Sequence, residues 1–167
     1  MSIQFKTGQI GDLPEILQLF KSAVATMDSQ GIFQWDEVYP DKAVLMSDIE
    51  KAELFIGVID EKIAVVYVLN HEFDEQYANG AWKCDEDRAI IIHRLCVNPA
   101  FQNQGLGRKT VEHIIEQVSV LGVKSIRLDA FTQNPFAVRL YEKLGFKTVG
   151  FADFRMGKFH LMEKPLV

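Results

Sequence analysis

The sequence has few cysteines and no long hydrophobic run. Its two cysteines, Cys84 and Cys96, are too few for a disulfide framework, so we expect a reducing compartment. No apolar stretch approaches the roughly 20 residues that a membrane-spanning helix needs. The N-terminal residues MSIQFKTGQIGDL contain neither the basic nor the apolar segment of a signal peptide. Together these absences predict a cytoplasmic protein with no membrane partner.

Positive charge is also scarce. The chain has 18 Lys and Arg against 23 Asp and Glu, a formal net charge of −5, which argues against nucleic-acid binding. The four histidines are scattered, and no Cys/His/Asp spacing is typical of a metal site, so we expect no metal. At 167 residues, without repeats or a Pro/Ser-rich linker, the chain is predicted to form one domain, residues 1–167.

Hydrophobic periodicity predicts a chain of alternating helices and strands. We expect strands at residues 3–7, 53–59, 62–69, 88–97, 124–131, 146–154 and 158–165. We expect helices at 13–28, from Pro40 to about residue 51, at 105–121 and at 135–144. Because a helix joins strands 88–97 and 124–131, these two should be parallel, whereas the hairpins add antiparallel pairs. The product is a mixed α/β sheet flanked by helices.

The first predicted helix carries two local signals. Asp12 and Glu15 have the spacing of a capping box at its N-terminus. The apolar residues at helical spacing, which should form its buried face, are Ile16, Leu17, Phe20, Val24 and Met27.

The most informative segment is Val97–Thr110, which reads VNPAFQNQGLGRKT. An apolar strand runs into a turn at residues 98–99, and Gln102-x-x-Gly105-x-Gly107 then leads into a helix. Glycine lets backbone N–H groups approach an anion closely and permits a positive φ. Residues 102–108, the glycine loop, are therefore predicted to bind an anion at a helix N-terminus. A simpler interpretation, in which the glycines only shape a strand–helix turn, stays open.

Two other phosphate-binding motifs fit this segment poorly. A P-loop needs Gly-Lys-Ser/Thr, but Arg108 separates Gly107 from Lys109. A Rossmann fingerprint needs a third glycine where Thr110 stands. Asp129 lies near the end of the next strand, close to where a ribose-binding acid would be, so dinucleotide binding remains a second hypothesis.

A second segment, NPFAVRLYEKLGF from Asn134, follows the strand at 124–131. The glycine loop and this segment, in this order and about 30 residues apart, resemble the two motifs of the GNAT superfamily of N-acetyltransferases. The resemblance covers roughly the C-terminal half of the chain. It implies a single-domain fold with a mixed, mostly antiparallel sheet of six to seven strands, flanked by about four helices.

The resemblance also implies a binding site for acetyl-CoA. The glycine loop would hold the pyrophosphate, and Asn103, which stands where many relatives have glycine, tolerates a left-handed backbone. In the family the preceding strand splays at a bulge, which frees backbone groups for the pantetheine arm and the thioester carbonyl. The implied contacts are Leu95, Cys96, Val97, Gln102, Asn103, Gln104, Gly105, Leu106, Gly107, Arg108, Asn134, Ala137 and Tyr141. Asn134 before a proline is also a favourable helix N-cap.

The resemblance gives Tyr141 the role of the acid that protonates the leaving thiolate. Many family members use a glutamate as base on the strand before the loop, but this strand has no carboxylate there. His93 is its one side chain that titrates near neutral pH, and Glu72 and Asp74 are alternatives. Cys96 lies in an apolar strand, where a raised pKa makes a thiol inert, so direct transfer in a ternary complex is favoured.

The acetyl acceptor should lie between the loops 29–40 and 70–87. Their acidic and aromatic side chains suit a cationic amine through charge and cation–π attraction. These side chains are Trp35, Tyr39, Glu72, Phe73, Asp74, Glu75, Tyr77, Trp82, Asp85 and Glu86. The leading hypothesis is an N-acetyltransferase for a small primary amine. A protein or peptide N-terminal acetyltransferase and a non-catalytic acyl-CoA sensor remain alternatives, and family members are often homodimers.

Overall fold

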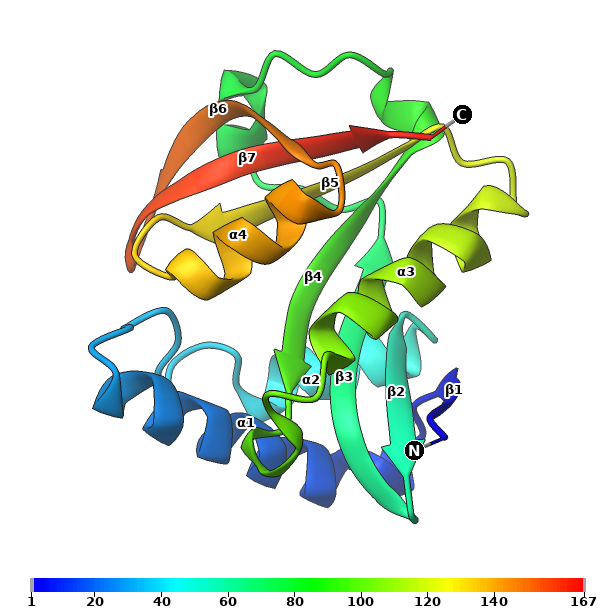
Figure 1. The fold of residues 1–167 in the computed structure, drawn as a ribbon, viewed down its shortest axis with the longest axis vertical. Coiled ribbons are helices and arrows are strands. Elements are labelled where there is room, and N and C mark those ends of the chain that lie inside the picture. Colours follow the sequence, from blue (N-terminus) through cyan, green and yellow to red (C-terminus); the bar gives the residue numbers. More distant parts are fainter. Residues whose placement is uncertain (1, 167) are drawn as a thin grey trace. The chain divides into compact units, whose positions relative to one another are not determined.

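The computed structural model describes residues 2–166, and its seven strands and four α-helices are shown in Figure 1. The strands are β1 (Gln4–Thr7), β2 (Leu54–Ile59), β3 (Lys62–Asn70), β4 (Ala89–Val97), β5 (Ser125–Phe131), β6 (Lys147–Phe154) and β7 (Gly157–Pro165). The helices are α1 (Leu13–Ser29), α2 (Lys42–Glu50), α3 (Leu106–Ser119) and α4 (Pro135–Lys143). The strand order is β1-β2-β3-β4-β5-β7-β6. This mixed, mostly antiparallel sheet confirms the predicted fold class.

The chain forms two compact units. The first comprises the residues up to Leu69 together with Arg94–Thr110, and the second comprises Asn70–His93 together with the residues from Val111 onward. β4 and α3 each begin in one unit and end in the other.

The first unit packs α1 and α2 against β2 and β3. Strands β1, β2 and β3 pair antiparallel, and the β2–β3 hairpin turns at Asp60 and Glu61, whose φ values are 49° and 65°. Two such left-handed residues form the tight turn that best suits a hairpin, as expected from the strand spacing. The core residues from the two helices and two strands are Leu13, Ile16, Leu19, Phe20, Ala23, Leu45, Ile49, Leu54, Ile56, Ile63, Val66 and Val68.

The second unit is built on β5. This strand pairs with β7 antiparallel along its whole length, and β7 pairs with β6 antiparallel. On its other side, residues Ser125–Arg127 pair in parallel with Ala89–Ile91 of β4, which confirms the predicted parallel pair. Helix α4 packs against β5, and Figure 1 shows it in front of the strands of this unit.

The start of α1 differs from the prediction. Asp12 is the N-cap residue, but its side chain accepts no capping hydrogen bond and instead accepts one from the Gln9 backbone N–H at 2.8 Å. Glu15 reaches across to β3 and accepts a hydrogen bond from the Ile63 N–H at 2.6 Å. The predicted capping box is therefore wrong, because a short 3₁₀ helix at residues 10–12 precedes α1 and a tertiary partner takes the glutamate.

The buried face of α1 is also rotated from the predicted one. Ile16 and Phe20 are buried as expected, but Leu17, Val24 and Met27 are half-buried. Leu13, Leu19 and Ala23 take their place in the core.

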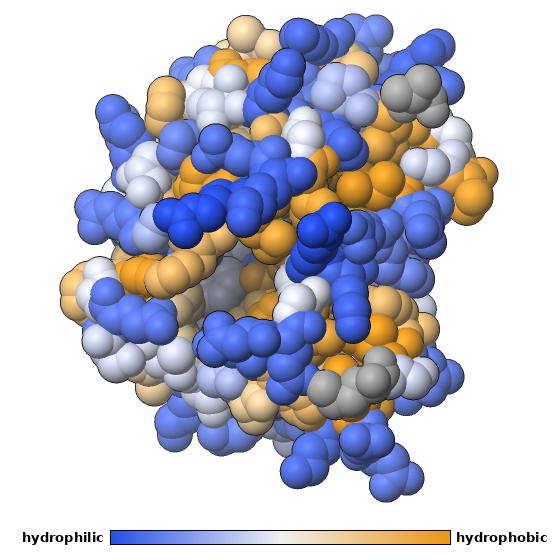
Figure 2. All heavy atoms as spheres, viewed as in Figure 1, coloured by the Kyte–Doolittle hydropathy of each residue, from blue (hydrophilic) through white to orange (hydrophobic). Residues whose placement is uncertain are grey.

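Hydrophilic and apolar residues are interspersed on the molecular face drawn in Figure 2. Within residues 2–166, every helix is too short or too polar to cross a membrane.

Candidate functional site

The glycine loop is attached to β3 through Asn98, the residue that follows β4. The Asn98 N–H donates to the Ala64 carbonyl at 2.8 Å, and its side-chain amide donates to the Ile63 carbonyl at 3.0 Å. Its side-chain oxygen accepts from the Ala100 N–H at 3.0 Å. These three bonds fix the turn that the sequence predicted at residues 98–99 and set where the loop begins.

The loop itself has a left-handed backbone at two positions. Asn103 has a φ of 63°, as expected from its tolerance of this conformation, and Gly105 has a φ of 72°. A Cβ atom built on Gly105 would meet no atom within 4 Å, so the backbone there faces open space. Residues 102–105 are exposed. A loop of this conformation leaves its backbone N–H groups accessible to an anion.

Helix α3 starts directly after the loop. Buried Leu106 packs with Ile59 and Ala64 and so anchors its first residue. The Lys109 N–H donates to the Gly105 carbonyl at 3.0 Å, which joins the glycine loop to the first turn of the helix. Thr110, which replaces a Rossmann glycine, is fully buried and donates its hydroxyl to the Leu106 carbonyl at 2.7 Å.

Strand β4 is irregular before it reaches the loop. Its parallel ladder to β5 covers only Ala89–Ile91, and further along the strand Arg94 has a φ of 50°. A left-handed residue inside a strand twists the strand locally, as β-bulges do. Leu95, Cys96 and Val97 follow this distortion. Burial raises the pKa of the Cys96 thiol, as expected for a thiol in an apolar strand.

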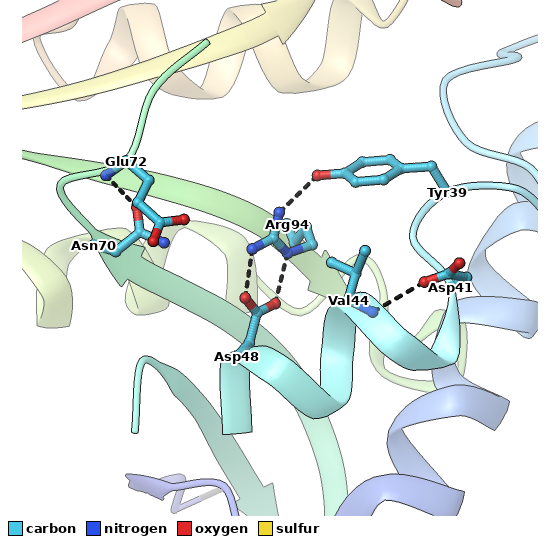
Figure 3. Close-up of polar contacts among 7 residues, drawn as sticks. All are labelled: Tyr39, Asp41, Val44, Asp48, Asn70, Glu72 and Arg94. Carbon is cyan, nitrogen blue, oxygen red and sulfur yellow. Dashed lines mark hydrogen bonds and ion pairs between the residues drawn. The ribbon is translucent and has the colours of Figure 1, made fainter. Parts of the chain in front are cut away.

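The Arg94 side chain makes a buried ion pair. Its Nε and Nη2 atoms donate to the two carboxylate oxygens of Asp48 on α2 at 2.8 and 2.7 Å, and Nη1 donates to the Tyr39 hydroxyl at 2.6 Å (Figure 3). Burial raises the pKa of Asp48, and the hydrogen bonds from Arg94 and its charge oppose that rise. No motif in the sequence marked Asp48 or Arg94, because their spacing of 46 residues has no local signature.

The remaining predicted cofactor residues lie on α4 in the second unit. Asn134 accepts a hydrogen bond from the Ala137 N–H at 3.2 Å and caps the helix, with Pro135 in the first turn. Ala137 is half-buried. Tyr141 is only 8% exposed, and its ring packs edge-on against Phe146 at a centroid distance of 5.6 Å.

Tyr141 belongs to an electrostatic group that the sequence did not reveal. Burial, and secondarily the charge of Asp129 on β5, raise the pKa of Tyr141. The same carboxylate accepts a hydrogen bond from the Tyr77 hydroxyl at 2.7 Å, and burial followed by Asp129 raises the pKa of Tyr77. Both tyrosines are therefore protonated over the physiological pH range. In the sequence alone, Asp129 is a candidate only for binding a ribose.

The predicted bases differ in their surroundings. His93 is half-buried on β4 in the second unit. Glu72 and Asp74 are exposed, and the Glu72 N–H donates to the Asn70 side chain at 2.9 Å (Figure 3).

The β3–β4 loop, residues 71–88, is held by a buried carboxylate from β7. Glu163 is 1% exposed and accepts hydrogen bonds from the Lys83 and Cys84 N–H groups at 2.7 and 3.2 Å. It also accepts one from the Ser125 hydroxyl at 2.8 Å. Sequence reasoning missed Glu163, although it interrupts an apolar strand pattern and could have been noticed there.

Aromatic residues of this loop are mostly structural. The guanidinium of Arg127 lies 4.5 Å from the Trp82 ring centroid, and the Trp82 Nε1 donates to the Tyr77 carbonyl at 2.6 Å. Tyr77 is 2% exposed, whereas Phe73 is 43% exposed and available to a ligand. In the first unit, Trp35 packs on the ring of Phe20.

Among the described residues, no group of three or more His, Cys, Asp or Glu side chains could hold a metal ion.

The sequence model of the Acetyltransferase (GNAT) family matches residues 13–146. The chain belongs to the GNAT family of acetyltransferases. The family resemblance of the two motifs is therefore confirmed.

Individual GNAT relatives are similar over parts of the chain. The [ribosomal protein bS18]-alanine N-acetyltransferase of Escherichia coli is 40% identical over 60 residues, which is 36% of this chain and 40% of that enzyme. The spermine/spermidine N(1)-acetyltransferase of Bacillus subtilis is 31% identical over 99 residues, 59% of this chain and 60% of that enzyme. The chain thus spans less than two thirds of either relative.

Solved GNAT structures share the fold over nearly the full chain. A GNAT acetyltransferase from Streptococcus agalactiae has a TM-score of 0.87 at 21% identity, covering 99% of this chain and 96% of that one. The PaiA N-acetyltransferase of Thermoplasma acidophilum, solved in complex with coenzyme A, has a TM-score of 0.74 at 19% identity, with coverage of 99% and 100%.

Proposed function

We propose that this GNAT enzyme transfers the acetyl group of acetyl-CoA directly to the primary amine of a small cationic molecule. The observation that carries the proposal is the exposed glycine loop, left-handed at Asn103 and Gly105 and continuous with the N-terminus of α3. A diphosphate fits such a loop because N–H groups and the helix dipole both favour negative charge. A structural relative bound to coenzyme A supports this choice of anion.

The donor would be held at three places. Backbone N–H groups of residues 103–108 would bind the pyrophosphate, with the Arg108 side chain adding positive charge. Backbone groups of Leu95, Cys96 and Val97, after the distortion in β4, would bind the pantetheine arm and polarise the thioester carbonyl. Asn134 would contact the arm while capping α4, and Ala137 would leave room for it on the helix face.

Tyr141 would act on the leaving sulfur. Burial keeps its phenol protonated, so it can donate a hydrogen bond throughout the working pH range. Because its pKa is raised above that of an ordinary thiol, about 8.5, complete transfer of the phenolic proton to the thiolate is uphill. We therefore propose that Tyr141 donates a hydrogen bond that stabilises the developing negative charge on sulfur, and that a water molecule supplies the proton that the thiolate finally takes.

For the base we favour Asp129 over His93, Glu72 and Asp74. Asp129 is the carboxylate that acts electrostatically on Tyr141, and the Tyr77 hydroxyl orients it. It would accept the proton of the acceptor ammonium group directly or through one water molecule.

The acceptor proposal rests on charge and on one relative. Glu72 and Asp74 flank exposed Phe73 in the sequence, and Glu75, Asp85 and Glu86 are exposed on the same loop of the second unit. Together these side chains would attract an ammonium group. The similarity to a spermine/spermidine acetyltransferase favours a polyamine. The similarity to an enzyme named for ribosomal protein alanine makes a protein N-terminus the second candidate.

The test begins with melting temperatures in acetyl-CoA, coenzyme A and NADH. At 100 times the Kd a ligand stabilises by about 2.7 kcal/mol, or about 5–10 °C at this chain length. We expect this shift with both CoA species and none with NADH, followed by thiol release with spermidine but not with an alanine-start peptide. A shift with NADH alone would refute the proposal, peptide acetylation would select the second candidate, and binding without thiol release on any amine would indicate a sensor.

A matched pair of variants places the binding in the glycine loop. Asn103→Val introduces a β-branched residue at a φ of 63°, and Ala52→Val does so at a φ of 57° outside the loop. Both should cost about 1–2 kcal/mol of stability, whereas only Asn103→Val should raise the Kd of coenzyme A, by about tenfold. Equal Kd values for both variants would contradict the role of the loop.

A further inference from the structure

We propose that Arg94 is a positioning residue, clamped by Asp48 and Tyr39, that fixes the β4 backbone where it would receive the thioester. This inference rests on the proposed function, because it assigns how that site is held in its active conformation. It concerns three segments of the first unit: α2, the loop before α2, and the end of β4 from Arg94 onward.

The backbone of Arg94 is what needs to be held. Five non-glycine residues have a positive φ among the described residues, and Arg94 is the one that lies inside a strand. Such a conformation persists only when the surroundings impose it, and it is typical of functional sites. The residue after it is Leu95, the first of the three whose backbone groups would meet the acetyl donor. A change in the Arg94 conformation would therefore redirect those groups.

The side chain supplies the constraint. Two nitrogens of Arg94 bind both oxygens of Asp48 at 2.8 and 2.7 Å, and a third binds the Tyr39 hydroxyl at 2.6 Å (Figure 3). Such a planar fork leaves the guanidinium a single orientation. Lysine could not reproduce it, because one ammonium group cannot make the same paired contact.

Burial of the pair argues for orientation rather than stability. The Arg94 and Asp48 side chains are 11% and 8% exposed. Removing two charges from water costs about as much free energy as their attraction supplies, so a buried ion pair adds little to the stability of the fold. Its presence is better explained by the single orientation that it imposes on the two side chains. Burial also raises the pKa of Asp48, because removal from water disfavours the charged carboxylate.

Tyr39 extends the constraint toward the acceptor. Tyr39 is 38% exposed, while its hydroxyl accepts a hydrogen bond from Arg94. The guanidinium carbon also lies 5.9 Å from the centroid of the Tyr39 ring. Tyr39, which the sequence places among the expected acceptor residues, would thus be held by the same side chain that holds the β4 backbone. Asp41 accepts a hydrogen bond from the Val44 N–H at 2.9 Å and so caps α2, the helix that carries Asp48.

The test compares Arg94→Lys, Asp48→Asn and Tyr39→Phe with two controls. Glu50→Gln removes an exposed charge from α2, and Leu19→Ala destabilises the core of the same unit without touching the ion pair. We expect Arg94→Lys and Asp48→Asn each to lower kcat at least tenfold while the Kd of coenzyme A, measured by calorimetry, changes less than threefold. Tyr39→Phe should raise the KM of the amine and leave kcat within threefold.

The double variant Arg94→Lys/Asp48→Asn should lower kcat no further than either single variant, because both remove the same constraint. If the variants lose no more kcat than Leu19→Ala at an equal fraction folded, the pair is only structural and the inference is overturned. If the unaltered enzyme neither binds coenzyme A nor releases thiol, the proposed function fails instead, so the two failures are distinguishable.

Discussion

Tyr141 shows how a single residue can be prepared for chemistry by its surroundings. The phenol is almost fully buried on α4, and both burial and the charge of Asp129 hold its pKa above the ordinary value. The sequence motif could name this tyrosine but not its protonation state, because that depends on a carboxylate 12 residues away on another element. The consequence is a permanent hydrogen-bond donor.

Replacing Tyr141 by phenylalanine should therefore damage turnover and spare binding. Phenylalanine fills the same volume beside Phe146, so we expect kcat to fall about 100-fold while the Kd of coenzyme A stays within twofold. Steady-state kinetics with thiol detection and calorimetry would measure the two quantities. Tyr67→Phe, at a fully buried tyrosine of β3, is the matched control and should leave kcat unchanged. Equal kcat values for the two variants would remove Tyr141 from the mechanism.

Single substitutions of Asp129 and of His93 can decide which of the two residues is the base. Asp129→Asn keeps an acceptor for the Tyr77 hydroxyl but cannot take up a proton, so kcat/KM for the amine should fall about 100-fold. His93→Gln should change it less than threefold. The kcat/KM profile between pH 6 and pH 9 would be measured for both. A large loss in His93→Gln with little effect of Asp129→Asn would restore the histidine on β4 as the base.

At the scale of elements, residues 71–88 behave as an anchored loop rather than a free one. The buried carboxylate of Glu163 accepts hydrogen bonds from two backbone N–H groups of this loop. Arg127 donates a further hydrogen bond to the Cys84 carbonyl at 2.7 Å. The acidic residues that would attract the acceptor are therefore carried on a backbone with a defined position. Pre-ordering of this kind lowers the entropic cost of binding.

Glu163→Gln should loosen that loop. The amide keeps one acceptor oxygen but loses the charge, so we expect a loss of about 1–3 kcal/mol and a fall in melting temperature of about 2–10 °C. Amide hydrogen exchange at Lys83 and Cys84 should accelerate more than exchange along β7. The exposed Glu116→Gln on α3 is the control and should do neither. Unchanged exchange at the two loop amides would show that the anchor lies elsewhere.

Sequence periodicity and the two motifs were sufficient to predict most elements. The strands, the four helices, the parallel pair and the left-handed Asn103 all follow from local patterns. The capping box at Asp12 and Glu15 failed because Glu15 found a partner on β3, 48 residues away. Asp48 and Arg94 were missed for the same reason, because they form a contact between distant segments that no local spacing encodes. Glu163 differs, since a charged residue in an apolar strand pattern is a local signal, but its partners on the β3–β4 loop are again distant.

At the scale of the whole molecule, Cys96 can report how ligand binding and folding are coupled. Its side chain is 4% exposed in the core of the first unit, and burial raises its pKa, so the reactive thiolate is scarce in the folded protein. Alkylation of Cys96 should therefore require unfolding. The half-buried Cys84 should react in the folded protein.

In a Cys84→Ser variant at pH 8, iodoacetamide should label Cys96 slowly, and coenzyme A at 100 times its Kd should slow this labelling by about 100-fold. The factor follows because a ligand that binds only the folded state lowers the unfolded population in proportion to 1 + [L]/Kd. NADH at the same concentration is the control and should have no effect. Mass spectrometry over time would measure both rates. Labelling that coenzyme A leaves unchanged would mean that Cys96 becomes reactive through a local opening that does not disturb the binding site.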